Sequence, residues 1–152
     1  MLSGGFLGTR ADWLLDLVIC ALVVIVPAVA VSWRLARRRE WVKHRNIQVG
    51  LVSVLTVAVS AFECDLRAAG GIWELTRASG YAGTALLRAV VYTHMTFSIS
   101  TAALWISLTA TSLAWHPSRF AIWHRWLGRL AMTDMLLTGA TAVPLYLLAF
   151  VF

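Results

Sequence analysis

The sequence predicts an all-α integral membrane protein, a bundle of four transmembrane helices whose N-terminus and C-terminus both lie outside. Of the 152 residues, 60% are hydrophobic and 13% are charged. That charged share is about half of the share in soluble domains. Four apolar stretches are close to or above the about 20 residues that cross a hydrocarbon core. Basic residues gather in two segments between these stretches, which is the pattern of cytoplasmic loops.

The predicted spans cover residues 13–33, 46–63, 89–115 and 131–152, and together they form one domain over residues 1–152. Each span is a helix, because lipid offers no partner for the backbone groups of an open strand. The first span contains Ala28-Val29-Ala30, which is similar to a signal-peptide cleavage motif. Acidic residues precede its apolar core and four arginines follow it, so we expect the first helix to be retained.

The basic charge indicates how the chain is oriented. Nine of the thirteen Lys and Arg residues lie in segments 34–45 and 119–129. The positive-inside rule places both segments in the cytoplasm, so we expect a multi-pass protein of the bacterial inner membrane, with the lipid bilayer as a partner. The same clustering argues against a nucleic-acid partner, which needs basic charge on a folded polar surface.

Small side chains, which allow helices to approach closely in lipid, recur at helical spacing in three spans. We expect these residues to form the helix contacts of a compact bundle. They are Ser53, Thr56 and Ser60, then Thr93, Thr96, Ser100 and Ala103, and the run 138–142.

Ionisable residues within spans are costly in lipid and are therefore candidates for function. Asp16, Glu63, Asp65 and His94 all fall toward the outer ends of predicted spans, where they could converge. One imidazole with two or three carboxylates suits a transition metal such as copper, zinc or iron. The same group also suits a proton relay, or a buried ion pair that only fixes the register of the helices.

At the inner side, one His-Arg dipeptide begins at His44 and another at His124, each opening a span in the same direction. This repetition predicts two imidazoles close together, which can ligate haem as in bis-histidine membrane cytochromes. The alternative is that both dipeptides are interfacial anchors that contact lipid phosphate. Asp134, further inside the fourth span, is expected to pair with Arg129 or Arg125.

Three short motifs resemble the pattern of a known family. They are the segment His124-Arg125-Trp126-Leu127-Gly128-Arg129, followed by Thr138-Gly139 and Tyr146-Leu147, then Lys43-His44-Arg45, and Tyr92-Thr93-His94. Over about residues 44–150 the chain resembles the small bacterial membrane proteins called the domain of unknown function 420 family. The resemblance makes His44, His94 and His124 the candidate functional histidines.

A member of that family is an assembly factor for a caa-type cytochrome c oxidase. The resemblance therefore implies a non-catalytic accessory or assembly protein that works with the subunits of a respiratory haem–copper oxidase. The residue pattern adds the expectation that Glu63, Asp65 and His94 bind or pass a metal ion in the outer leaflet. Two alternatives remain open, a redox-active haem subunit and a purely structural subunit of a larger membrane complex. The chain carries no hydrolase, kinase or dehydrogenase signature, which argues against an enzyme of those classes.

Overall fold

A computed structural model describes residues 4–114 and 121–152 of the chain and confirms the all-α fold. The long helices are α1 (Trp13–Arg37), α2 (Trp41–Ala68), α4 (Ala85–Ala114) and α5 (Ala121–Tyr146). A single turn, α3 (Ile72–Leu75), lies between α2 and α4, and a π-helix, η1 (Leu147–Val151), continues α5. Four helical segments of the described chain are long and apolar enough to cross a membrane. The protein is therefore a multi-pass membrane protein.

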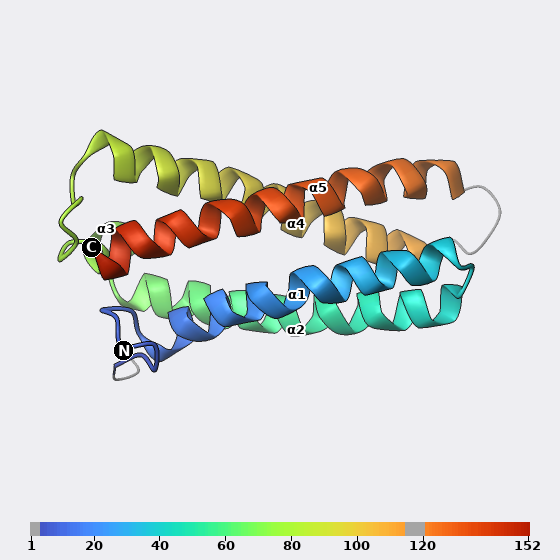
Figure 1. Cartoon of the computed structure of the whole chain (residues 1–152), viewed down its shortest axis with the longest axis horizontal. Helices are drawn as coiled ribbons and strands as arrows, with labels where there is room; N and C mark the ends of the chain where they lie inside the picture. The colour runs from blue at the N-terminus through green and yellow to red at the C-terminus, as the bar shows by residue number, and fades with distance from the viewer. Residues whose placement is uncertain (1–3, 115–120) are drawn as a thin grey trace.

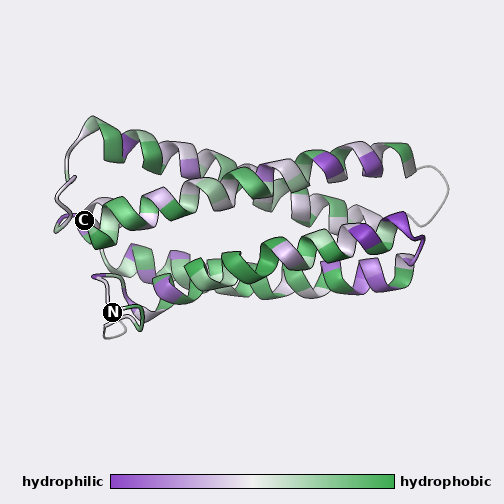
Figure 2. Cartoon of the chain, viewed as in Figure 1, coloured by the Kyte–Doolittle hydropathy of each residue, from purple (hydrophilic) through white to green (hydrophobic). Residues whose placement is uncertain are grey.

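The four long helices form two antiparallel hairpins, α1 with α2 and α4 with α5 (Figure 1). Contacts within each hairpin are more extensive than contacts between the hairpins, which join α1 to α5 and α2 to α4. Both chain termini lie at one end of the bundle, which we call the terminal end (Figure 1). The opposite end holds the turn from α1 to α2 and the start of α5, and we call it the basic end. Hydrophilic residues gather there in Figure 2.

The helices extend beyond the predicted spans at most of their ends. Helix α2 begins at Trp41 rather than at residue 46 and continues to Ala68, and α5 begins at Ala121 rather than at residue 131. The prediction followed hydrophobicity alone, whereas a helix continues into the polar interface as long as its backbone bonds are made and its long basic side chains reach water. The predicted end of the third span, residue 115, lies outside the described residues.

Local signals explain where α1 begins and ends. The side chain of Asp12 accepts a hydrogen bond from the backbone N–H of Leu15 at 2.8 Å, so it caps the first turn. After Arg37 the chain reverses within three residues, and Arg39 takes a φ of 62° in this turn. The left-handed conformation is unusual for arginine, and it lets α2 return directly along α1.

Buried apolar residues lie in two separate groups. Ile25, Val29, Trp105 and Met135 join the two hairpins in the middle of the bundle, and Ala11, Ala149 and Phe150 lie at the terminal end. Many large apolar residues are exposed, such as Val57 at 71%. Within a membrane these side chains face lipid, whose acyl chains are as apolar as they are.

Only part of the predicted small-residue packing occurs. Thr138 and Ala142 are buried between helices, as predicted for the fourth span. Ser53, Thr56 and Ser60 are exposed, so the predicted face of α2 does not pack inside the bundle. The hydroxyl of Thr56 instead donates to the carbonyl of Val52 on its own helix at 2.7 Å, and a hydroxyl satisfied in this way can face lipid.

Candidate functional site

A cavity of about 850 Å³ lies at the basic end, between the two hairpins. Small-molecule and cofactor sites typically measure about 300–1,000 Å³. Its apolar wall includes Val29, Trp33, Trp105, Leu108, Met132 and Met135. Its polar wall includes Arg37, Arg39, His44, Arg45, Gln48, Ser112, His124, Arg125 and Arg129, and none of the described residues that line it is acidic. The cavity is therefore amphipathic and strongly cationic.

The two histidines predicted to approach each other do so in this cavity. His44 lies in the first turn of α2 and His124 in the first turn of α5. The centroids of their rings are 6.4 Å apart and the ring planes are 81° from parallel. Because α2 and α5 belong to different hairpins, this pair of imidazoles spans the interface between the hairpins.

A chain of hydrogen bonds from three helices orients His44. The indole N–H of Trp105 donates to Oε1 of Gln48 at 2.5 Å, and Nε2 of Gln48 donates to the hydroxyl of Ser32 at 3.0 Å. Nδ1 of His44 lies 2.9 Å from the carbonyl oxygen of Ser32 and 2.8 Å from its hydroxyl. A carbonyl oxygen only accepts, so this contact places the ring proton on Nδ1 and the lone pair on Nε2.

His124 is oriented in the same way by the other hairpin. The hydroxyl of Ser112 donates to the carbonyl oxygen of Leu108 at 2.6 Å, and it lies 3.1 Å from Nδ1 of His124. Since its proton is donated to the Leu108 carbonyl, the Ser112 hydroxyl accepts from Nδ1–H of His124. Metal-ligating histidines typically show this arrangement, with one ring N–H held by the protein and the other nitrogen basic.

Sequence reasoning missed Ser32, Gln48, Trp105 and Ser112, which hold the two imidazoles. Gln48 alone carried a signal, because it is a polar residue inside a predicted span and lies one helical turn after His44. Ser32 and Ser112 lie 12 residues before the histidines that they contact. Two residues that are 12 positions apart and on different helices of a hairpin come into contact only when those helices pack in a defined register.

Basic side chains surround the mouth of the cavity. The guanidinium of Arg37 lies 5.0 Å from the ring centroid of Trp33, which holds it at the interface. Lys43 donates a hydrogen bond to Glu40 at 2.6 Å, and this bond lowers the pKa of the Glu40 carboxyl group. An anionic group that reaches this end of the protein therefore meets several arginines whose charge is not cancelled by acids lining the cavity.

His94 lies on the seam between α4 and α5, away from the cavity, and both of its ring nitrogens are engaged. Nδ1 is 3.1 Å from the hydroxyl of Thr141, and Nε2 is 3.1 Å from the hydroxyl of Ser98. Because a metal ligand needs a nitrogen lone pair, these bonds make His94 a hydrogen-bonding residue of the helix interface.

Asp134 lies on the same seam, and its partners differ from the predicted ones. Ser100 and Thr101 donate to Oδ2 of Asp134 at 2.6 Å and 3.0 Å. The expected ion pair with Arg129 or Arg125 does not form, because the carboxyl group of Asp134 faces α4 rather than the basic end.

At the terminal end, Asp16 is fully buried, at 0% exposure. The hydroxyl of Tyr146 donates to Oδ1 of Asp16 at 2.5 Å, and the backbone N–H of Leu7 donates to Oδ2 at 2.7 Å. Tyr146 is also 2.7 Å from the hydroxyl of Thr9. These bonds tie the segment before α1 to the last turn of α5 and close this end of the bundle.

Replacing Tyr146 with Phe is expected to lower the free energy of unfolding by about 1–3 kcal/mol, since a buried carboxylate then loses a donor. Thermal unfolding in detergent measures the change. Tyr92→Phe is the matched control, because Tyr92 is 58% exposed and makes an aromatic contact with Trp73. Equal stability of the Tyr146 variant and the wild type would show that the Asp16 contact does not hold this end together.

The structure does not support the predicted metal centre in the outer leaflet. Asp16 is enclosed by Tyr146 and the N-terminal segment, and Glu63 pairs with Arg67 on the surface of α2 at 3.4 Å. Asp65 lies on α2, shortly after Glu63. His94 is hydrogen-bonded to Thr141 where α4 packs against α5. Within residues 4–114 and 121–152, no group of three or more His, Cys, Asp or Glu side chains could hold a metal ion.

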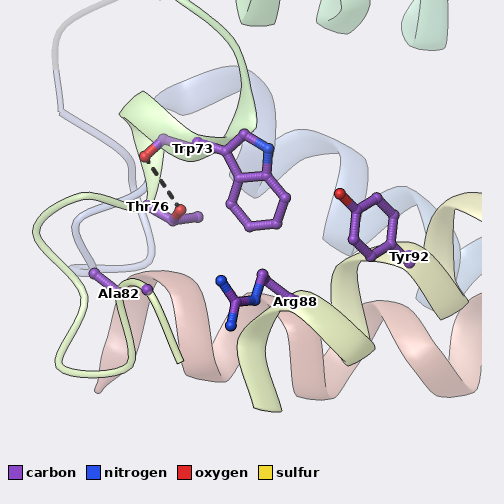
Figure 3. A pocket seen from close by; sticks show the side chains of 6 residues that line it. Trp73, Thr76, Ala82, Arg88 and Tyr92 are labelled. Carbon is purple, nitrogen blue, oxygen red and sulfur yellow. Dashed lines mark hydrogen bonds between the residues drawn. The ribbon is translucent and has the colours of Figure 1, made fainter. Parts of the chain in front are cut away.

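A second, smaller pocket of about 370 Å³ lies at the terminal end (Figure 3). Trp73 and Tyr92 form one side of it, with ring centroids 6.0 Å apart, and the guanidinium of Arg88 points toward Ala82 in the loop opposite. Exposed Trp, Tyr and Arg side chains at the end of a bundle are typical of a membrane interface. None of the described residues that line this pocket is a histidine, cysteine or carboxylic acid, so the basic-end cavity is the stronger candidate for function.

Comparisons with known proteins identify no relative. No protein-family model matches the chain, and no curated protein or solved structure is significantly similar to it. The functional argument therefore depends on the geometry of the basic-end cavity and on the chain's own residues.

Proposed function

We propose that this protein binds one haem in the basic-end cavity, where His44 and His124 would hold its iron, and carries electrons within a larger membrane complex. The approach of the two imidazoles is the observation that carries the proposal. A metal–imidazole bond measures about 2.0–2.1 Å, so two imidazoles whose ring centroids lie about 6 Å apart could both ligate one metal ion. The rings of His44 and His124 are 6.4 Å apart.

The number of donors favours haem over a bare metal ion. A protein zinc site needs three or four protein ligands, and two imidazoles meet in this cavity among residues 4–114 and 121–152. Haem iron receives four nitrogens from its own macrocycle, so two histidines complete its coordination. The hydrogen bonds at Nδ1 of both imidazoles support the same assignment, because ligating histidines typically donate one ring N–H to the protein.

The lining of the cavity also suits haem. The macrocycle is a large apolar plate that carries two carboxylates at one edge. Val29, Leu108 and Met135 supply apolar surface deep in the cavity, and the arginines lie toward the basic end. Carboxylates directed to that end would meet guanidinium groups, which bind them in charge-assisted hydrogen bonds.

A haem held in this way supplies reversible one-electron transfer. His44 and His124 would hold its iron, the apolar lining would exclude water, and the arginines would neutralise its carboxylates. Two imidazole ligands leave no open coordination position for a substrate, which supports an electron-transfer role rather than catalysis at the iron.

The test is an optical spectrum with elemental analysis on protein purified in mild detergent from cells supplied with iron and a haem precursor. We expect about one iron per chain, a haem absorbance band, and a change of that band on reduction with dithionite. A colourless protein without iron would overturn the proposal. Stoichiometric copper or zinc in place of iron would indicate a metal site of another kind.

The family resemblance favours a second candidate, an accessory or assembly protein for a respiratory haem–copper oxidase of the bacterial inner membrane. Its support is the motifs around His44, His94 and His124. In a strain that lacks this protein, the second candidate predicts oxidase subunits that are made but remain inactive, and wild-type oxidase activity would contradict it. A purely structural subunit predicts that variants of all three histidines assemble and function normally.

Replacing Ser112 with Ala should weaken haem binding while both ligands remain. His124 then loses an acceptor for Nδ1–H, and loss of such a partner typically lowers metal affinity about 10–100-fold. Haem titration of the purified apoprotein measures the affinity. Ser107→Ala on the same helix is the matched control, because Ser107 is exposed and does not line the cavity. Equal affinities for both variants would argue against this contact.

A further inference from the structure

Arg88 places an unpaired positive charge in the wall of the terminal-end pocket. Among the described residues that line this pocket, it is the one charged residue. Its guanidinium forms no ion pair or hydrogen bond within residues 4–114 and 121–152, and the acid on neighbouring α3, Glu74, pairs with Arg77 at 2.9 Å. Arg88 lies in the first turn of α4, where the positive end of the helix dipole disfavours a cation. Helix stability therefore does not account for this arginine.

The shape and chemistry of the pocket suit a phosphate group. Figure 3 shows the guanidinium of Arg88 directed across the pocket toward Ala82, with the rings of Trp73 and Tyr92 along one side. The hydroxyl of Thr76 donates to the carbonyl oxygen of Ile72 at 2.9 Å, so its proton is already used. A guanidinium carries donors only, in a planar fork that matches two oxygens of a phosphate. The pocket therefore offers a positive charge and charged donors to an anion.

The pocket lies at the depth of the lipid headgroups. Helix α4 has 30 residues, which corresponds to a length of about 45 Å. A bilayer measures about 40–45 Å with its headgroup regions and about 30 Å without them. The first turn of α4, which carries Arg88, therefore falls within the headgroup layer at the terminal end. Lipid phosphates lie in this layer, and Trp and Tyr side chains are enriched there.

An exposed apolar surface leads from the pocket toward the middle of the membrane. Arg88, Tyr92, Met95 and Ile99 follow one another on α4 at spacings of four, three and four residues, so they share one face of the helix. Tyr92, Met95 and Ile99 are all exposed. A lipid whose phosphate contacts Arg88 can therefore lay an acyl chain along this face of α4. A free anion would gain nothing from the same surface.

We propose that the terminal-end pocket binds the headgroup phosphate of an anionic phospholipid, with Arg88 as the residue that holds the phosphate. A zwitterionic headgroup also carries an ammonium group, which needs an acceptor, and the described residues that line the pocket include no carboxylate. A headgroup with a net negative charge, such as phosphatidylglycerol, is therefore favoured. The pocket shares no described residue with the basic-end cavity, so this site does not depend on haem binding.

Native mass spectrometry in mild detergent tests the proposal, with phosphatidylglycerol or phosphatidylethanolamine of matched acyl chains added. Arg88→Gln should lower the affinity for phosphatidylglycerol about 10–100-fold, because hydrogen bonds to a charged group are lost. Its affinity for phosphatidylethanolamine should stay close to that of the wild type. Arg88→Lys keeps the charge without the planar fork and should give an intermediate affinity. Arg77→Gln is the matched control, because Arg77 is exposed at the same end and does not line the pocket.

A second measurement locates the bound lipid, because arginines at the basic end also attract anionic headgroups. Phosphatidylglycerol with a photoreactive headgroup should label residues 73–92 of the wild type and not those of Arg88→Gln. Absence of label from this segment, or equal phosphatidylglycerol affinity in Arg88→Gln and the wild type, would overturn the proposal. An equal loss of affinity in Arg77→Gln would overturn it as well, since net charge then explains the binding. Displacement of the lipid by excess inorganic phosphate would assign the pocket to a free anion instead.

Discussion

Replacing either His44 or His124 with Ala is expected to remove bound haem from the purified protein. In the proposed site both imidazoles would ligate the iron, so loss of either side chain would remove one of the two protein ligands. Loss of a hydrogen-bond partner of a ligand already lowers metal affinity about 10–100-fold, so loss of the ligand itself should exceed this range. The measured quantities are iron per chain and absorbance of the haem band.

Residual haem in a single variant would be informative about coordination. A variant with one histidine left should show the spectrum of five-coordinate iron, and added imidazole should restore the six-coordinate spectrum because it can occupy the emptied space. The double variant should be colourless. His94→Ala is the matched control, because it also removes an imidazole from the bundle but lies on the α4–α5 seam rather than in the cavity.

Two outcomes would contradict the assignment. If His94→Ala loses haem as completely as His44→Ala, general instability of the bundle explains the loss. If His44→Ala and His124→Ala both keep the wild-type spectrum, the haem is ligated elsewhere. Thermal unfolding of each apoprotein, recorded in the same detergent, separates a lost ligand from a lost fold.

Filling the cavity should exclude haem while both histidines remain. Gly128 lines the cavity one helical turn after His124, and a Cβ built at this position meets no atom within 4 Å. Leucine at this position would therefore project into open space that the haem needs. Overpacking costs about 1–3 kcal/mol, which corresponds to a loss of about 5–150-fold in haem affinity.

Gly128→Leu is not expected to damage the fold. Glycine inside a helix is less favourable than Leu or Ala by up to about 1 kcal/mol. Gly50→Leu is the matched control, because Gly50 also lies in a long helix with no atom within 4 Å of its Cβ position, but it does not line the cavity. Gly128→Ala, a much smaller change, should keep most of the haem. Full occupancy in Gly128→Leu would show that haem does not enter this cavity.

The sequence determined the class of protein and the positions of its main elements. Four long apolar stretches and two basic segments predicted the four helices, and the structure confirms them. The similar positions of His44 and His124, each opening a span in the same direction, predicted their approach. Because both residues lie in the first turn of helices that begin at the same end of the bundle, their depth follows from counting residues alone.

The tertiary structure decided which side chains meet across the bundle. Local periodicity could not predict this, because in a membrane the lipid-facing side of a helix is as apolar as the side that packs inward, so hydrophobicity does not identify the inner face. Counting residues placed Asp16, Glu63, Asp65 and His94 at a similar depth. Because their side chains point in different directions around the helix axes, Asp16 contacts Tyr146 and Glu63 contacts Arg67.

The partner of Asp134 was decided in the same way. Its distance along the helix from Arg129 allowed an ion pair, but the packing of α5 on α4 turns its carboxyl group toward Ser100 and Thr101. The helix register likewise brings Ser32 and Ser112 to the two imidazoles and leaves the cavity between the hairpins. Sequence thus set how deep each polar group lies, whereas the rotation and register of packed helices set what it contacts.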